Sequence, residues 1–345
     1  MPTTYAIPNG RTVMDATTYT GNGGTQTIVN NDLGTAGFKP DLVWVKSRSN
    51  GEWNVLGDSV RGTGKSLFSN RTDAEYADGY TAFNSNGFGI NSWTGTNGNG
   101  YTYVAWQWQA GQGTTTTNNV GSYSSQVSVN ATAGFSVVTY TGAGVAGTIG
   151  HGLGVAPQMI ISKNRSAAED WRVAHIGLTN MASWHCNLDT TQTQSNSGAA
   201  VWNNTTPTST IFGVGTDTSV SGSGNGIVAY CWAPVAGFSQ FGSYVGNGSA
   251  DGSFVYLGFK PSFIMVKNIT QTGNWEIYDT SRNLYNQTYA ALYANLAATE
   301  DSSNVIDILS NGFKLRNTSQ NTNTSGDTFI YACFAENPFK FSNAR

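Results

Sequence analysis

Short apolar runs, each bounded by proline, glycine and polar turn residues, set the pattern of this chain. One run occupies residues 42–45 (Leu-Val-Trp-Val), and similar runs occupy residues 159–161 and 263–266. A short continuous apolar run of this kind predicts a β-strand that is covered on both faces. A polar turn follows each run and leads to a segment that alternates apolar and polar residues. The pattern therefore predicts a β-hairpin at three places along the chain.

The three hairpins belong to a longer repeat in which the same residue types recur in the same order. Each copy has a proline, a lysine six positions later, a tryptophan, and then an acid or a histidine. These residues are Pro40, Pro157 and Pro261; Lys46, Lys163 and Lys267; Trp53, Trp171 and Trp275; Asp58, His175 and Asp279. The repeat is about a hundred residues long, which is the size of a small domain and too long for a solenoid unit.

The repeat divides the chain into an N-terminal arm and three tandem domains. The arm is residues 1–14, and the domains are residues 15–112 (repeat 1), 120–236 (repeat 2, the most divergent) and 237–345 (repeat 3). The arm is interpreted either as an extended attachment segment or as an ordinary frayed terminus. Residues 111–119 and 233–238 are expected to be linkers.

Further short strands are expected inside each repeat. The last ones are residues 103–108, 227–232 and 329–334, and each is expected to pair with the first strand of its repeat. Residues 289–301 are the one segment whose composition suits a short helix. Many short strands without a long helical period predict an all-β fold of three tandem β-sandwich domains in a row.

Composition limits the classes of function. Only 11% of the residues are charged and the net charge is −3, whereas 12% are aromatic. A soluble chain typically has about 25% charged residues. This surface is therefore expected to present mainly hydroxyl and amide groups. The charged residues form no basic patch of the kind that binds nucleic-acid phosphates, so nucleic-acid binding is not expected. No apolar run is long enough to span a membrane, so we expect a soluble protein that is made in the cytoplasm.

Motifs for cofactors and metals are weak. Residues 59–66 end in Gly-Lys-Ser like a phosphate-binding loop, but serine stands where the first glycine is needed, and no strand–loop–helix context follows. The histidines lack the spacing of a zinc site, and the acids of residues 73–78 lack that of a calcium loop. The histidines are His151, His175 and His185. We therefore expect no cofactor and no metal.

Acidic residues near the hairpins are expected to have structural roles. Asp58 and Asp279 each precede an arginine by three residues, Arg61 and Arg282, which predicts local ion pairs. Lys46 and Lys267 are possible partners of these acids across the hairpin. A carboxylate pair for glycoside cleavage remains open because such pairs are defined in space. However, no acid is shared by all three repeats, so we expect no enzyme.

The repeated tryptophans are weak candidates for stacking on sugar rings. They are Trp53, Trp171 and Trp275. An aliphatic residue follows each of them two positions later, which is the pattern of a strand face that points into a core. We therefore expect the tryptophans to be core residues, and expect any glycan contacts on the variable loops.

Four motifs together resemble a known family. They are Gly-Phe-Lys-Pro-Asp-Leu-Val-Trp-Val-Lys at residues 37–46, Asp-Ser-Val-Arg-Gly at 58–62, Asn-Gly-Phe at 86–88 and Tyr-Val-Ala-Trp-Gln-Trp at 103–108. The leader (residues 5–13) and the C-terminal segment (335–345) add to the likeness, whereas repeat 2 departs from it. The chain resembles a repeated domain of uncharacterised function in structural proteins of tailed bacteriophages, particularly marine ones. The resemblance implies a virion component with lectin-like or jelly-roll β-sandwich domains and supplies no catalytic residues.

Three functions are consistent with these observations. The first is a tail fibre or receptor-binding protein exposed on a phage particle, which binds a host surface glycan. The second is a capsid decoration or head-fibre protein, and the third is a glycan depolymerase. Other virion proteins are expected as partners, with residues 1–14 as a possible attachment segment. A homo-oligomer, such as a trimer, is expected, although three repeats on one chain could instead imitate a trimer.

Overall fold

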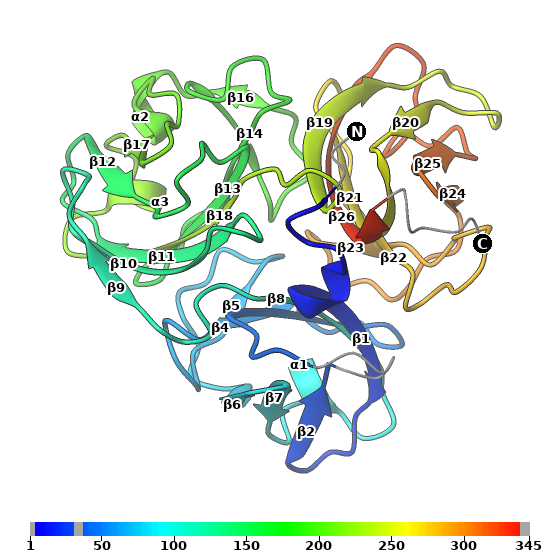
Figure 1. Cartoon of the computed structure of the whole chain (residues 1–345), viewed down its shortest axis with the longest axis horizontal. Coiled ribbons are helices and arrows are strands. Elements are labelled where there is room, and N and C mark those ends of the chain that lie inside the picture. The colour runs from blue at the N-terminus through cyan, green and yellow to red at the C-terminus, as the bar shows by residue number, and fades with distance from the viewer. Residues whose placement is uncertain (1–3, 31–36, 339–345) are drawn as a thin grey trace.

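The computed structural model describes residues 4–30 and 37–338, and in this part the chain folds almost entirely into β-strands (Figure 1). The all-β prediction is therefore confirmed. Sequence-based expectations for residues 1–3 of the arm, and for residues 339–345 of the C-terminal motif, lie outside the described residues.

Each repeat contains one large antiparallel sheet with the same strand order. In repeat 1 the order is β1 (Met14–Thr20), β8 (Thr102–Trp108), β3 (Leu42–Ser47), β4 (Val55–Asp58) and β5 (Leu67–Phe68). Repeat 3 matches it with β19 (Ser239–Val245), β26 (Thr328–Pro338), β21 (Phe259–Asn268), β22 (Trp275–Asp279) and β23 (Leu292–Tyr293). Repeat 2 matches it with β11 (Phe135–Thr141), β18 (Gly226–Trp232), β13 (Met159–Asn164), β14 (Arg172–His175) and β15 (Trp184–Asn187). The first and last strands pair in every repeat, as the sequence predicts.

Repeat 2 extends its large sheet beyond this common plan. β16 (Ser195–Asn196) lengthens one edge, while β10 (Ser125–Asn130) and β9 (Thr116–Asn118) lengthen the other. The expected linker at residues 111–119 therefore contains a strand, because Thr116–Asn118 pairs with β10. Four helical segments occur in the described residues, each of a single turn: η1 (Gly10–Thr12), α1 (Thr94–Asn97), α2 (Ala199–Trp202) and α3 (Thr218–Ser221). None is long and apolar enough to cross a membrane.

A small sheet covers one face of each large sheet. In repeat 1 it consists of β2 (Gln26–Val29), β7 (Gly87–Ile90) and β6 (Tyr80–Asn84). In repeat 2 it consists of β12 (Gly147–Gly150) and β17 (Ile211–Val214), and in repeat 3 of β20 (Phe254–Tyr256), β25 (Gly312–Leu315) and β24 (Ile306–Leu309). Side chains on successive strand residues point to opposite faces, so each large sheet has a second face to bury.

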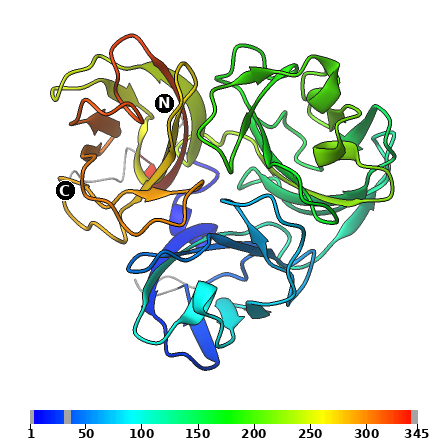
Figure 2. The same cartoon turned by 180° about the vertical axis from the view of Figure 1, so that it is seen from behind.

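The second faces of the three large sheets pack against one another. In β3, Val43 and Val45 belong to the core between the two sheets of repeat 1. Leu42 and Trp44 instead belong to a cluster that contains buried residues from all three repeats. The repeats thus lie around a common centre instead of in a row (Figures 1 and 2). Each large sheet is covered on both faces, which is why its strands are nearly continuous apolar runs.

The common centre is closely packed. Trp108 from β8 makes edge-on contacts with Trp232 from β18 and with Phe334 from β26, at ring-centroid distances of 6.0 and 5.7 Å. These three residues hold equivalent places, because each pairs with the first residue of the equivalent part of β3, β13 or β21. The cavity between the three repeats is about 10 Å³, which leaves room for at most about one water molecule.

Two further sequence-based expectations about local structure are wrong. The described part of the N-terminal arm, residues 4–14, packs against the repeats instead of forming a separate attachment segment or a frayed end. Ile7, Val13 and Met14 are buried in the common cluster, and Arg11 forms an ion pair with Glu336 of repeat 3 (3.6 Å). The segment 289–301, expected to be a helix, contains β23 instead, because its apolar residues pair with β22 at the sheet edge.

Candidate functional site at the junctions between repeats

Strand register shows which residues of the three repeats are equivalent. The acid or histidine of each hairpin lies opposite an apolar residue of the preceding strand: Leu42 opposite Asp58, Met159 opposite His175, and Phe263 opposite Asp279. Counting back four residues from these positions reaches Trp171 and Trp275, but in repeat 1 it reaches Asn54. The predicted equivalence of Trp53 with the other two tryptophans is therefore wrong by one residue. A slip of one residue moves a side chain to the opposite face of a strand.

Asn54 takes over the hydrogen bond that the tryptophans make. Nε1 of Trp171 donates to the carbonyl of Phe68 (2.8 Å) and Nε1 of Trp275 donates to that of Asn187 (2.9 Å). In repeat 1, Nδ2 of Asn54 donates to the carbonyl of Tyr293 (2.7 Å). The three acceptors are equivalent residues of β5, β15 and β23. Each repeat thus donates to the preceding one, and repeat 1 donates to repeat 3, which closes a ring.

The three tryptophans therefore differ in their surroundings. Trp171 and Trp275 are fully buried at junctions, where no sugar can stack on them. Trp53 lies just before β4, half-buried against Phe68 and Trp93, and the guanidinium of Arg71 lies 4.3 Å from the centre of its ring.

The repeated lysines make a second ring of contacts. Nζ of Lys163 donates to the carbonyl of Thr72 in repeat 1 (2.8 Å) and to that of Glu169 in its own repeat (2.8 Å). The equivalent bonds of Lys46 reach Ala297 and Glu52, and those of Lys267 reach Thr191 and Gly273. The expected pairing of Lys46 and Lys267 with the carboxylates is therefore wrong. Each ammonium instead satisfies buried carbonyl oxygens on both sides of a junction.

Burial makes these lysines less basic. It lowers the pKa of each of Lys46, Lys163 and Lys267 from 10.5 to about 8. A buried charge is costly unless hydrogen bonds compensate it. Here the carbonyls of two repeats offset part of this cost, and each lysine has both of these partners only while both repeats are in place.

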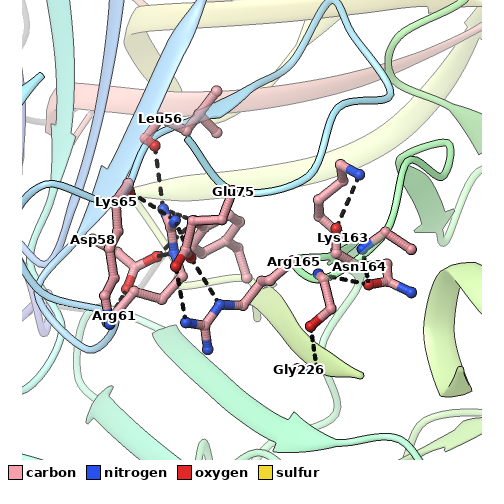
Figure 3. A network of polar contacts seen from close by, with 12 residues as sticks. Leu56, Asp58, Arg61, Lys65, Glu75, Lys163, Asn164, Arg165 and Gly226 are labelled. Carbon is pink, nitrogen blue, oxygen red and sulfur yellow. Dashed lines mark hydrogen bonds and ion pairs between the residues drawn. The ribbon is translucent and has the colours of Figure 1, made fainter. Parts of the chain in front are cut away.

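A network of charges lies beside the lysine at the junction between repeats 2 and 1 (Figure 3). Asp58 and Arg61 form a fully buried ion pair, and the hydroxyl of Tyr230 in repeat 2 donates to Asp58 (2.8 Å). Arg61 also contacts Glu75 (3.1 Å), which in turn accepts from Arg165 of repeat 2 (2.9 Å). Figure 3 shows the side chain of Arg165 reaching across the junction towards this carboxylate.

The charges of the network balance one another. Burial alone would raise the pKa of Glu75, but the hydrogen bond from Arg165 and the charges of Arg61 and Arg165 outweigh it and lower the pKa. Arg61 also donates to the carbonyls of Leu56 (3.2 Å) and Lys65 (2.8 Å). With every group paired, the network resembles a structural ion-pair assembly more closely than an activated catalytic group.

The junction between repeats 1 and 3 has the same network. Asp279 pairs with Arg282 (2.6 Å), and Nε1 of Trp106 in repeat 1 donates to Asp279 (2.9 Å). Arg282 also contacts Glu300 (2.9 Å), which pairs with Arg48 of repeat 1 (3.0 Å). Ion pairing within each Asp–Arg motif is therefore present. The second arginine, which reaches across from the neighbouring repeat, has no signal in the sequence.

The junction between repeats 3 and 2 replaces these charged groups with neutral ones. The equivalent residues are His175, Leu178, Gln194, Ile269 and Ala332. His175 accepts from the amide of Gly177 through Nδ1 (3.0 Å), so its Nε2 carries the proton and donates to the carbonyl of Tyr331 in repeat 3 (3.0 Å). Burial lowers the pKa of His175 to about 4, which keeps this histidine neutral at pH 7.

Two further acids have a raised pKa, and burial raises that of Asp189 to about 6. Burial raises the pKa of Glu276 to about 7. However, this carboxyl is fully buried between the two sheets of repeat 3, where Tyr278 (2.5 Å), Asn304 (2.5 Å) and Asn321 (2.8 Å) donate to it. No substrate reaches it in this arrangement. Within residues 4–30 and 37–338, no group of three or more histidine, cysteine, aspartate or glutamate side chains is placed to hold a metal ion.

Comparison with known proteins gives one match. A family model described as "Domain of unknown function (DUF7483)" covers residues 10–338, which is nearly the whole chain. No curated protein and no solved structure matches.

Proposed function

The chain belongs to the DUF7483 family, and from this premise we propose that it is a structural protein of a tailed-bacteriophage particle. In this proposal it is a non-enzymatic tail fibre or receptor-binding protein exposed on the virion. It would be made in the host cytoplasm and would bind a host surface glycan.

One observation carries the proposal: side-chain donors at equivalent positions of all three repeats join the repeats to one another. The lysines and the donors at Asn54, Trp171 and Trp275 reach carbonyls of a neighbouring repeat. An enzyme copied three times would be expected to retain a reacting group at an accessible place. A chain whose repeats share mainly the contacts that join them is better suited to being a rigid module that presents variable surfaces.

The ring also supports a proposal about assembly. Three repeats around one centre give a single chain the symmetry that a homotrimer obtains from three subunits. We propose that the chain joins a trimeric partner in the virion as one copy. Light scattering would then give the single-chain mass of 36.6 kDa for the purified protein, whereas the mass of a trimer would favour a homotrimeric fibre.

The location is tested by labelling purified phage particles with an antibody raised against the whole chain. Gold label on the tail is the expected result. Absence of the protein from particles, checked by mass spectrometry, would contradict the virion proposal as a whole.

A second candidate, a capsid decoration or head-fibre protein, is favoured by the same threefold arrangement, since it fits a threefold site on a capsid. Label on the head would support it. The depolymerase candidate relies on Glu276, which is enclosed. Release of reducing ends from host envelope polysaccharide by the purified chain, lost in Glu276→Gln, would support that candidate instead.

A further inference from the structure

Repeat 2 carries an open groove of about 560 Å³ beside its junction with repeat 1. Its walls come from β10 and β11, from the segment that precedes β10, and from Arg165 and Gly226. The volume lies within the range of about 300–1,000 Å³ that is usual for ligand sites.

Two features form the groove, and repeats 1 and 3 lack both of them in their described parts. First, β10 lengthens the large sheet beyond β11, whereas β1 and β19 are the outer strands of theirs. Second, Gly226 stands where the other repeats have threonine. Thr141 pairs with Gly226 just as Thr20 pairs with Thr102 and Val245 pairs with Thr328. The missing side chain leaves room beside Arg165.

The lining offers groups that both donate and accept hydrogen bonds. Thr139 and Thr141 contribute hydroxyl groups on one face of β11, and Gln126 contributes a carboxamide from the pairing position opposite Thr139. Neither threonine hydroxyl forms a hydrogen bond within the described part of the chain. The half-buried ring of Tyr123 adds an aromatic wall, held in place because its hydroxyl donates to the carbonyl of Val145 (2.5 Å).

The charge in the groove is already balanced. Nε and Nη2 of Arg165 bind Glu75 (2.9 and 3.2 Å), while Nη1 makes no hydrogen bond to any described residue. Arg165 can therefore offer an N–H donor without an unpaired charge. An acidic ligand would lack an unpaired cation here, whereas a ligand with many hydroxyl groups would find complementary partners.

We propose that this groove binds a neutral oligosaccharide. The hydroxyl groups of Thr139 and Thr141 and the carboxamide of Gln126 hold the sugar hydroxyls, and Tyr123 packs against a ring face. The absence of a side chain at Gly226 admits the ligand. This inference rests on the proposed function and names the site through which that function would recognise a glycan.

The test is a titration of the whole chain with neutral oligosaccharides of glucose, galactose, mannose and N-acetylglucosamine, and with acidic oligogalacturonate. Backbone amide shifts and calorimetry report the binding. We expect at least one neutral probe to shift the amides of β10, β11 and Gly226. The proposal is wrong if no neutral probe binds, or if only oligogalacturonate does.

Two variants and a matched control locate the site. Gly226→Thr installs the residue of the other repeats and should abolish binding. The fold should tolerate it, because a Cβ there meets its nearest neighbour, Nη1 of Arg165, at 3.6 Å. Thr139→Val should weaken binding about tenfold, the loss of roughly one hydrogen bond. Thr18→Val, at the equivalent position of repeat 1, should leave binding unchanged.

Binding that survives Gly226→Thr in a folded protein, or that Thr18→Val weakens as much as Thr139→Val does, would overturn the assignment. Neither result would affect the antibody labelling of particles. Failure of the glycan site is therefore distinguishable from failure of the virion proposal.

Discussion

Two of the three junctions contain a network of buried ion pairs, and the third, called the neutral junction below, has uncharged residues at the positions of that network. At the charged junctions an aspartate, two arginines and a glutamate form one network, with Asp58 and Arg61 at the centre of the first and Asp279 and Arg282 at the centre of the second. At the neutral junction, a histidine and apolar or amide side chains occupy all of these positions. The lysine and the indole or amide donor are nevertheless present at every junction.

The comparison shows which contacts are shared by all three junctions and which residues can be replaced without opening the ring. Hydrogen bonds from side chains of one repeat to carbonyls of the preceding repeat, or of repeat 3 in the case of repeat 1, occur at all three junctions, so they are the shared contacts that close the ring. The charged groups are present as a complete set or replaced as a complete set. A buried ion pair can be exchanged for apolar residues at little cost, whereas losing one partner leaves an unpaired charge in the interior.

The largest effect is expected from breaking one charged set. Arg61→Leu gives repeat 1 the residue that repeat 2 has at Leu178, but it leaves Asp58 buried without its cation. We expect a loss of about 3–5 kcal/mol in the free energy of unfolding, measured by urea denaturation. Leu178→Met, a similar change of side chain at the neutral junction, should cost less than about 1.5 kcal/mol.

Replacing the whole set sharpens this test. Asp58→His, Glu75→Gln, Arg165→Ile and Tyr230→Ala, added to Arg61→Leu, convert the first junction to the residues of the third. This chain should be more stable than Arg61→Leu alone, because no charge is left unpaired. A five-residue variant less stable than the single one would show that the charges act independently.

Between pH 6.5 and about 4.5, the neutral junction should lose more stability than the charged junction that contains Glu75, whose carboxylate stays ionised in this range because its pKa is lowered. The pKa of His175 is about 4 in the folded chain and about 6.5 when unfolded. Below pH 6.5 the unfolded chain binds a proton that the folded chain does not, so stability falls as the pH falls from 6.5 to 4. The loss from this residue should reach about 3 kcal/mol.

His175→Gln isolates that contribution, because an amide can still donate to the carbonyl of Tyr331 but does not titrate. Urea denaturation at pH 7 and pH 4.5 should show a smaller loss for the variant than for the parent chain. Since burial also lowers the pKa values of His151 and His185, some loss should remain. Equal losses in the two proteins would contradict a buried, neutral His175.

The lysines should have similar effects at all three junctions. Lys163→Met keeps the length of the side chain but leaves the carbonyls of Thr72 and Glu169 without this donor, at an expected cost of about 1–3 kcal/mol. Lys46→Met and Lys267→Met should fall in the same range. If Lys267→Met alone were harmless, the shared bonds would not be what closes the neutral junction.

Much of the fold could be predicted because local patterns determine it. The runs at residues 42–45, 159–161 and 263–266 are apolar throughout because both faces of their strands are buried, and this property is visible in the sequence. The common centre could not be predicted in this way. The period of two assigns Trp44 to one face of a strand, but it does not say whether that face meets the same repeat or another one.

The hydrogen bonds between repeats could not be predicted for a related reason. Lys46 is near Asp58 in the sequence, which predicts a local ion pair between them. In the structure, Nζ of Lys46 instead donates to the carbonyl of Ala297, which belongs to another repeat. The register error did have a signal. Trp171 and Trp275 each precede the acid or histidine by four residues, but Trp53 precedes Asp58 by five. Spacing from that position would have identified Asn54 as the equivalent residue.

The smallest effect is expected where the charged network reaches solvent. Arg48 and Glu300 are about a quarter exposed, so Arg48→Met should cost less than about 1 kcal/mol. Because salt screens an ion pair near the surface, the difference in free energy of unfolding between variant and parent should be smaller in about 0.5 M salt than in dilute buffer. Ile269→Met, the same position at the neutral junction, should show no dependence on salt. A salt effect of equal size in both variants would mean that the Arg48–Glu300 pair does not distinguish the two kinds of junction.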